Sequence, residues 1–194
     1  MGYPLDKTVR FVFMAPWNEG VAMNSSELGM DKVVSSEDFL AAMRGAVTPV
    51  SIVTTNGAAG EFGLTVSAVS SVSAEPPLVM VCINRRTGAE AAIRSNGVFC
   101  LNLLAETQVA LAESFAGRSK TLESYDFSSA EWTEGVTGSR CLVGAVASFD
   151  CQIDSVIEAG THSVFIGRVV HIETTSAVPL AYQNRMFSKA IPLA

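Results

Sequence analysis

Hydroxyl side chains alternate with apolar ones along Gly63 to Ser70, and they are the residues of this sequence best suited to binding chemistry. If the stretch is a strand, Thr65 and Ser67 share one face, because successive side chains of a strand point to opposite sides. A row of hydroxyl and backbone N–H groups can bind a phosphate and the polar edge of a ring without a cluster of basic residues. The residues alone leave a second interpretation open, an edge strand with one solvated face.

A second polar element follows an apolar strand, at Cys82 to Gly88. The strand ends in Asn84, two arginines and the start of a helix. A helix N-terminus beside arginine and threonine is suited to an anion, because its first backbone N–H groups lack partners within the helix. Adjacent arginines are also common on solvated surfaces, so two interpretations stay open here as well.

Several enzyme classes are excluded by missing motifs. The sequence has no GxGxxG, GxxxxGK[ST], GxSxG or HExxH pattern, which excludes a classical P-loop enzyme, a serine hydrolase and a metal hydrolase. His162 and His171 are the only histidines, and their odd separation on one expected strand predicts that they face opposite sides. We therefore expect no metal site. The four cysteines form no CxxC pair, which indicates reduced core thiols of a cytoplasmic protein.

Strands must position these groups, since β-branched runs dominate the chain after residue 35. We expect strands over Val50 to Thr55, Leu64 to Val72, Leu78 to Ile83, Val98 to Leu104, Val143 to Ile153, Ser163 to Ile172 and near Leu180 to Tyr182. We expect helices from a capping box at Ser35 to about Gly45, over about Ala89 to Arg94 and over Glu106 to Phe115. Residues 118–140 are polar and rich in turn residues, which predicts a loop or covering excursion. This pattern predicts a mainly β chain, a β-barrel with a few flanking helices.

The composition favours one domain of a self-associating protein. Of 194 residues, we assign 1–30 to an N-terminal extension and 31–194 to the domain. Hydrophobic residues make up 48% and charged residues 16%, so we expect apolar surface to be buried in a homodimer. The net charge of −6 predicts no general binding of nucleic acid or of an anionic membrane surface. No apolar run is long enough to span a bilayer.

Five stretches together resemble the short-chain flavin reductases, the reductase components of two-component flavin-dependent monooxygenases. The longest reads Gly-Leu-Thr-Val-Ser-Ala-Val-Ser-Ser-Val-Ser-x-x-Pro-Pro-Leu-Val-x-Val-Cys-Ile-Asn-Arg over residues 63–85. The others cover residues 95–104, 115–117, 160–163 and 179–182. The similarity extends over about residues 36–187.

This resemblance implies a split, Greek-key-like β-barrel that binds FMN or FAD, takes hydride from NADH or NADPH and forms a homodimer. It implies that reduced flavin diffuses to a partner oxygenase. It assigns flavin binding to Gly63, Leu64, Thr65, Ser67, Ala68, Cys82, Ile83, Asn84, Gly88, Ala89, Ser114 and Phe115. It also places Tyr182 in the carboxy-terminal dinucleotide contact region and His162, the one catalytic candidate, beside the nicotinamide.

The absence of a recognisable catalytic acid–base pair in the sequence agrees with hydride transfer to a flavin. Hydride transfer between two stacked rings needs no protein nucleophile and no metal, only reacting atoms held ~3–3.5 Å apart. One alternative is a non-catalytic flavin-binding or electron-carrier module on the same barrel. Another is an enzyme related to the pyridoxamine-phosphate oxidases, which predicts more basic residues at the phosphate than Arg85 and Arg86.

Overall fold

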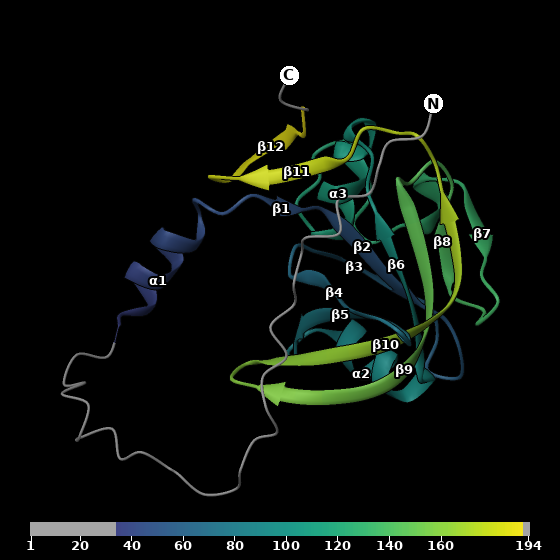
Figure 1. Cartoon of the computed structure of the whole chain (residues 1–194). Coiled ribbons are helices and arrows are strands. Elements are labelled where there is room, and N and C mark those ends of the chain that lie inside the picture. The colour runs from purple at the N-terminus through teal and green to yellow at the C-terminus, as the bar shows by residue number, and fades with distance from the viewer. Residues whose placement is uncertain (1–33, 192–194) are drawn as a thin grey trace, which may run out of the picture.

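Seven antiparallel strands form the main sheet of this computed structural model, which describes residues 34–191 (Figure 1). The expected extension, residues 1–30, lies outside the described residues. The sheet order is β3-β2-β6-β9-β10-β5-β4. Its strands are β2 (Ser51–Thr55), β3 (Phe62–Val66), β4 (Val69–Ala74), β5 (Pro77–Asn84), β6 (Val98–Leu103), β9 (Ala147–Ala159) and β10 (His162–Thr174).

The two edges of this sheet are consecutive in the chain. The hydrogen-bonded order begins at β3 and ends at β4, and only Ser67 and Ala68 join the two strands. The Cys82 N–H donates to the Ala68 carbonyl at 2.9 Å, so the corner between the edge strands rests on β5. The sheet therefore curls until its edges meet without pairing, which is a split barrel. The expected mainly β split barrel with few helices is confirmed.

Smaller elements surround the barrel. Two further sheets have the orders β1-β11-β12 and β7-β8. Their strands are β1 (Thr48–Pro49), β11 (Leu180–Gln183), β12 (Met186–Lys189), β7 (Trp132–Glu134) and β8 (Arg140–Leu142). The helices are α1 (Ser36–Met43), α2 (Gly88–Asn96), α3 (Val109–Phe115) and the 3-10 turns η2 (Glu106–Gln108) and η3 (Phe127–Ser129).

Some expected boundaries are wrong. The single strand expected over Leu64 to Val72 is two strands that meet at a corner at Ser67 and Ala68. The sequence does not reveal this corner, because apolar and hydroxyl side chains keep alternating through it. The polar segment 118–140 contains η3, β7 and the start of β8 in place of a plain loop. The β9 strand begins later than expected and runs on to Ala159, and β12 was not expected.

Two apolar clusters stabilise this arrangement. Val53, Ile83, Phe99 and Phe165 are fully buried inside the barrel, and burying each side chain contributes roughly 1.5–3 kcal/mol. Gly167 is required there, because a Cβ at this position would collide with the Phe99 ring. The second cluster packs α3 and β11 against the outer side of β2 and includes Ile52, Leu104, Phe115, Leu142 and Leu180.

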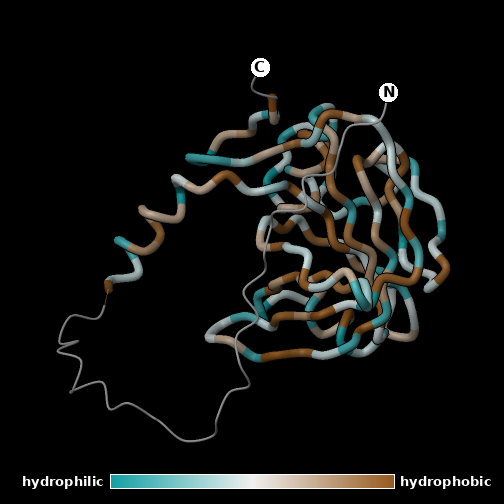
Figure 2. Tube along the Cα trace, viewed as in Figure 1, coloured by the Kyte–Doolittle hydropathy of each residue, from teal (hydrophilic) through white to brown (hydrophobic). Residues whose placement is uncertain are grey.

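The helices α1 and α2 are packed very differently. The α2 helix is capped by Thr87, ends at Gly97 in the left-handed region (φ 72°) and buries Ala89, Glu90, Ala92 and Ile93. The α1 helix is capped by Ser35 but has no buried residue, and it stands away from the barrel (Figure 1). Its apolar side chains are exposed in this chain. Figure 2 marks the hydrophobic positions of α1 in brown.

Candidate functional site

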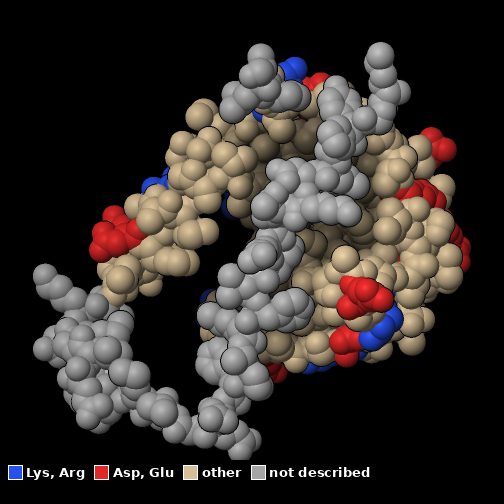
Figure 3. Space-filling view, viewed as in Figure 1, with Lys and Arg blue, Asp and Glu red and all other residues tan. Residues whose placement is uncertain are grey.

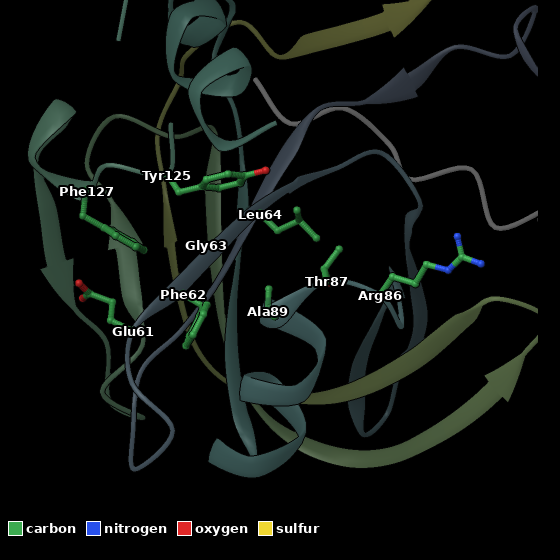
Figure 4. A pocket seen from close by; sticks show the side chains of 10 residues that line it. Glu61, Phe62, Gly63, Leu64, Arg86, Thr87, Ala89, Tyr125 and Phe127 are labelled. Carbon is green, nitrogen blue, oxygen red and sulfur yellow. The ribbon is translucent and has the colours of Figure 1, made fainter. Parts of the chain in front are cut away.

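A cavity of about 580 Å³ lies between β3, the start of α2 and the segment that carries Tyr125 and Phe127. Its lining consists of Glu61, Phe62, Gly63, Leu64, Arg86, Thr87, Gly88, Ala89, Tyr125 and Phe127. Leu64, Thr87 and Ala89 lie close to one another, Tyr125 lies across from α2, and the Arg86 side chain extends away from them (Figure 4). The volume falls within the usual range for cofactor pockets.

The α2 N-terminus gives this cavity a place for an anion. Thr87 Oγ1 accepts a hydrogen bond from the Glu90 N–H and fixes the first turn. Within the described residues, the N–H groups of Gly88 and Ala89 have no recorded partner, and both residues line the cavity. Backbone N–H groups at a helix start bind phosphate oxygens well. The donor set therefore fits the phosphate of a flavin nucleotide.

Ser114 and Phe115 lie beneath the cavity lining. Both are fully buried, and Ser114 Oγ donates to the Glu123 carbonyl at 2.5 Å. The Phe115 ring packs edge-on against Phe127, with 5.0 Å between ring centroids. A Cβ at Gly63 would collide with the Phe115 ring, so the glycine lets β3 lie directly on it. In this chain these two side chains hold the lining in place and do not form part of it.

Successive parts of β3 line different cavities, Phe62 to Leu64 the first and Thr65 to Val66 the second. Leu64 faces the first, whereas Thr65 and Ser67 line a second cavity of about 470 Å³ together with Tyr182. Thr65 Oγ1 donates to the Ala112 carbonyl at 2.7 Å, so this hydroxyl is left to act as an acceptor toward a ligand. The structure thus does not bring the flavin residues expected on β3 into a single cavity.

Arginines gather around the second cavity. Arg118 and Arg185 line it, and they also line an adjoining cavity of about 680 Å³ together with Arg44. Arg185 has a positive φ of 64°, which is uncommon for a residue with a side chain. The sequence analysis did not find these arginines, because they lie far apart along the chain and follow no common motif.

Three of the expected flavin-binding residues, Cys82, Ile83 and Asn84, form the end of β5. Ile83 is fully buried in the barrel core, so it supports the sheet and exposes no surface to a ligand in this structure. Asn84 Oδ1 accepts from the Arg86 N–H at 2.9 Å, and the Asn84 carbonyl accepts from Thr87, which fixes the turn into α2. Burial raises the pKa of the Cys82 thiol, which is therefore protonated at neutral pH and is no nucleophile. These residues lie outside the linings of the three cavities.

His162 begins β10 and lies opposite Asn84 of β5 in the sheet register. Its Nδ1 is 3.0 Å from Thr161 Oγ1, and the residue is half-buried. A register shift between Val169 and His171 interrupts the alternation along β10. The prediction that His162 and His171 face opposite sides of β10 assumed an unbroken alternation. The register shift removes that basis.

Two properties of residues 34–191 bear on metal and membrane binding. No three His, Cys, Asp or Glu side chains in this range are grouped as they would be around a metal ion. No helix in the same range is long and apolar enough to cross a membrane.

Comparisons with known proteins agree with this geometry. The model of the flavin reductase like domain matches residues 43–190. The FMN reductase (NADH) RutF of Ancylobacter novellus is 42% identical over 137 residues, 71% of this chain and 75% of that protein. BorF, the flavin reductase component of a bacterial two-component tryptophan halogenase, has a TM-score of 0.71 at 27% identity, over 80% of this chain and 98% of BorF. The Streptomyces globisporus NADH:FAD oxidoreductase SgcE6, in complex with NAD and FAD fragments, has a TM-score of 0.74 at 25% identity, over 83% and 98% of the two chains.

The split barrel, with a cavity lined by the N-terminus of α2, is the architecture of a flavin-binding oxidoreductase. The match over most of the described chain makes the family assignment specific: this chain belongs to the flavin reductase family.

Proposed function

We propose that this protein transfers a hydride from NADH to FMN and releases the reduced flavin to a partner monooxygenase. The observation that carries this proposal is the first cavity, in which the open N-terminus of α2 faces the apolar side chains of β3. Such a site suits a nucleotide with one phosphate and a flat ring. The names of the relatives, FMN reductase (NADH) and flavin reductase component, support the same activity.

The phosphate would be held by Gly88 and Ala89, with Thr87 keeping their N–H groups in place. The ring would lie against the apolar side chains of Phe62 and Leu64 in the same cavity. When bound, the flavin supplies the hydride acceptor. The chain holds and orients it, and the lining of the first cavity contains no cysteine or histidine that could attach it covalently. Noncovalent binding agrees with release of the reduced flavin.

The nicotinamide would lie between His162 and the second cavity. Tyr182 lines this cavity and offers a ring for stacking, and its ring is itself steadied by Phe187 at 5.2 Å between centroids. Arg118 and Arg185 bring positive charge to a protein whose net charge is −6, which suits the phosphates of a dinucleotide. His162 would position the nicotinamide, because hydride transfer itself requires no proton from the protein.

We also propose a homodimer in the cytoplasm. Phe39, Leu40 and Met43 of α1 are each at least half exposed in this chain, which favours a second copy as their cover. Much of the visible surface at α1 is uncharged, with acidic and basic atoms beside it (Figure 3). The acidic residues of its first turn are Glu37 and Asp38. The four cysteines are free thiols, which supports a reducing compartment.

Anaerobic mixing of the protein with NADH and FMN tests the activity, with the loss of NADH absorbance and the bleaching of FMN as readouts. We expect FMN-dependent oxidation of NADH, and we expect FMN and NADH to be used better than FAD and NADPH. Flavin binding without reduction by either nicotinamide would instead identify an electron-carrier module and would overturn the proposed activity.

A further inference from the structure

Glu90 is a nearly buried carboxylate in the first turn of α2, with 7% of its surface exposed. Its Oε1 accepts a hydrogen bond from Ser163 Oγ at 2.7 Å and from Arg94 Nη2 at 2.7 Å. Arg94 Nε also donates to Oε1 at 3.2 Å. A buried charge is tolerated only when it is paired and hydrogen-bonded, so these contacts are the condition for Glu90 to occupy this position.

The partner of Glu90 is the neighbour of His162 in the chain. Ser163 is fully buried, and its hydroxyl also accepts from Arg94 Nη2 at 3.1 Å. Arg94 lies over the Phe165 ring as well, 5.7 Å from its centroid. The first residues of β10 are therefore held against α2 by side chains that are 73 residues apart in the sequence.

The turn on the other side of His162 is also fixed. The Arg85 N–H donates to the Thr161 carbonyl at 3.1 Å, and Arg85 Nη2 donates to the Gly160 carbonyl at 2.5 Å. Arg85 Nη1 pairs with Glu158 at 2.6 Å. The His162 ring itself has one recorded contact within the described residues, with Thr161. Its direction is therefore set mainly by the backbone on either side of it.

We propose that Glu90 is a positioning residue that fixes His162 relative to the N-terminus of α2. This inference rests on the proposed function, in which α2 holds the flavin phosphate and His162 positions the nicotinamide. The start of α2 then sets the distance between the phosphate site and His162. Thr87, Gly88 and Ala89 line the cavity, and Glu90 accepts a hydrogen bond from Ser163 of β10.

A double-mutant cycle with Glu90→Ala and His162→Ala tests the proposal. Each single variant should raise the KM for NADH about tenfold and lower kcat less, because positioning of the co-substrate is lost. The dissociation constant of FMN should stay within about twofold in Glu90→Ala, because Thr87 still caps α2. If Glu90 acts through His162, the double variant should resemble His162→Ala alone, whereas a general structural role would make the two effects add.

Two further variants keep the test decisive if Glu90→Ala folds poorly. Glu90→Gln retains an oxygen that accepts from Ser163, so it should recover most of the parent KM. Ser163→Ala removes the contact to β10 but leaves the pair of Glu90 and Arg94, so it should reproduce the rise in KM. The matched control is Asp154→Ala, which breaks the exposed pair with Arg168 on the same hairpin and should leave all constants unchanged.

An NMR measurement distinguishes failure of this proposal from failure of the proposed function. The chain has two histidines, so His162→Ala assigns their ring signals without any ligand. Glu90→Ala should shift or broaden the His162 signal and leave that of His171 in place. Unchanged His162 signals, or additive effects in the cycle, would overturn the positioning role. Absence of NADH oxidation in the parent, with the expected NMR change, would overturn the function alone.

Discussion

The helices α1 and α2 have similar lengths and similar N-caps, yet they are used in opposite ways. Each has a hydroxyl cap, Ser35 in one and Thr87 in the other, and an acidic first turn. The α2 helix buries four residues and reaches β10 through Glu90, whereas α1 buries none. Local signals therefore form a helix in both places, but packing decides whether the helix is buried against the barrel and shapes a site or keeps its apolar side chains exposed.

The largest expected effect is on the free energy of unfolding, for a substitution on the buried face of α2. Ile93→Ala should lower the free energy of unfolding by about 3 kcal/mol, because Ile93 is fully buried and leaves a cavity. Ile157→Ala is the matched control and should change it by less than about 0.5 kcal/mol, because Ile157 is 54% exposed. Urea denaturation of both variants measures the contrast, and equal losses would refute it.

The apolar face of α1 should affect assembly and not folding. Replacing Phe39 and Leu40 by Glu should weaken the proposed dimer at least about 100-fold, because two large apolar side chains leave the interface. Light scattering over a range of concentrations gives the mass, and circular dichroism checks the fold. Val136→Glu, at a position 76% exposed outside α1, is the control and should keep the parent mass. A monomeric parent would show that α1 has another role.

The two N-caps sharpen the comparison. Thr87→Ala should reduce FMN affinity about fivefold, because losing an N-cap costs about 1 kcal/mol and frees the α2 turn that carries Gly88 and Ala89. Ser35→Ala removes the corresponding cap of α1 and should leave FMN affinity unchanged. Quenching of FMN fluorescence measures both. Equal effects of the two variants would mean that the phosphate does not bind at α2.

The smallest expected effect is a pH dependence confined to α2. Burial alone raises the pKa of Glu90, but hydrogen bonds from Ser163 and Arg94 and the charges of Arg94 and Arg85 lower it below its ordinary value of 4.5. Because the pKa is lower in the folded state, the stabilisation is complete above pH 4.5 and is lost as the pH falls through the lowered value. Urea denaturation of the parent and Glu90→Gln should therefore show a stability difference at pH 6 that shrinks below pH 4. A constant difference would contradict the ion-pair origin.

The sequence by itself determined the class of fold and most of the family motif. Most of the β-branched runs formed strands and the capping box at Ser35 formed a helix, because these are local signals. Local features also indicated a helix start after the apolar strand that ends at Asn84, whereas the assignment of Gly88 and Ala89 to the flavin site came from the family resemblance. These features depend on neighbours within a few positions, which is the range that a single sequence shows directly.

The tertiary structure decided how those elements meet. The alternation of apolar and hydroxyl side chains from Leu64 onward continues through the corner at Ser67, so only the tertiary structure shows that Leu64 lines one cavity and Thr65 to Ser67 line another. The Glu90 and Ser163 contact joins residues that no local pattern relates. Such contacts depend on the path of the whole chain, because a buried charge becomes stable only where distant partners are brought within hydrogen-bond distance of it.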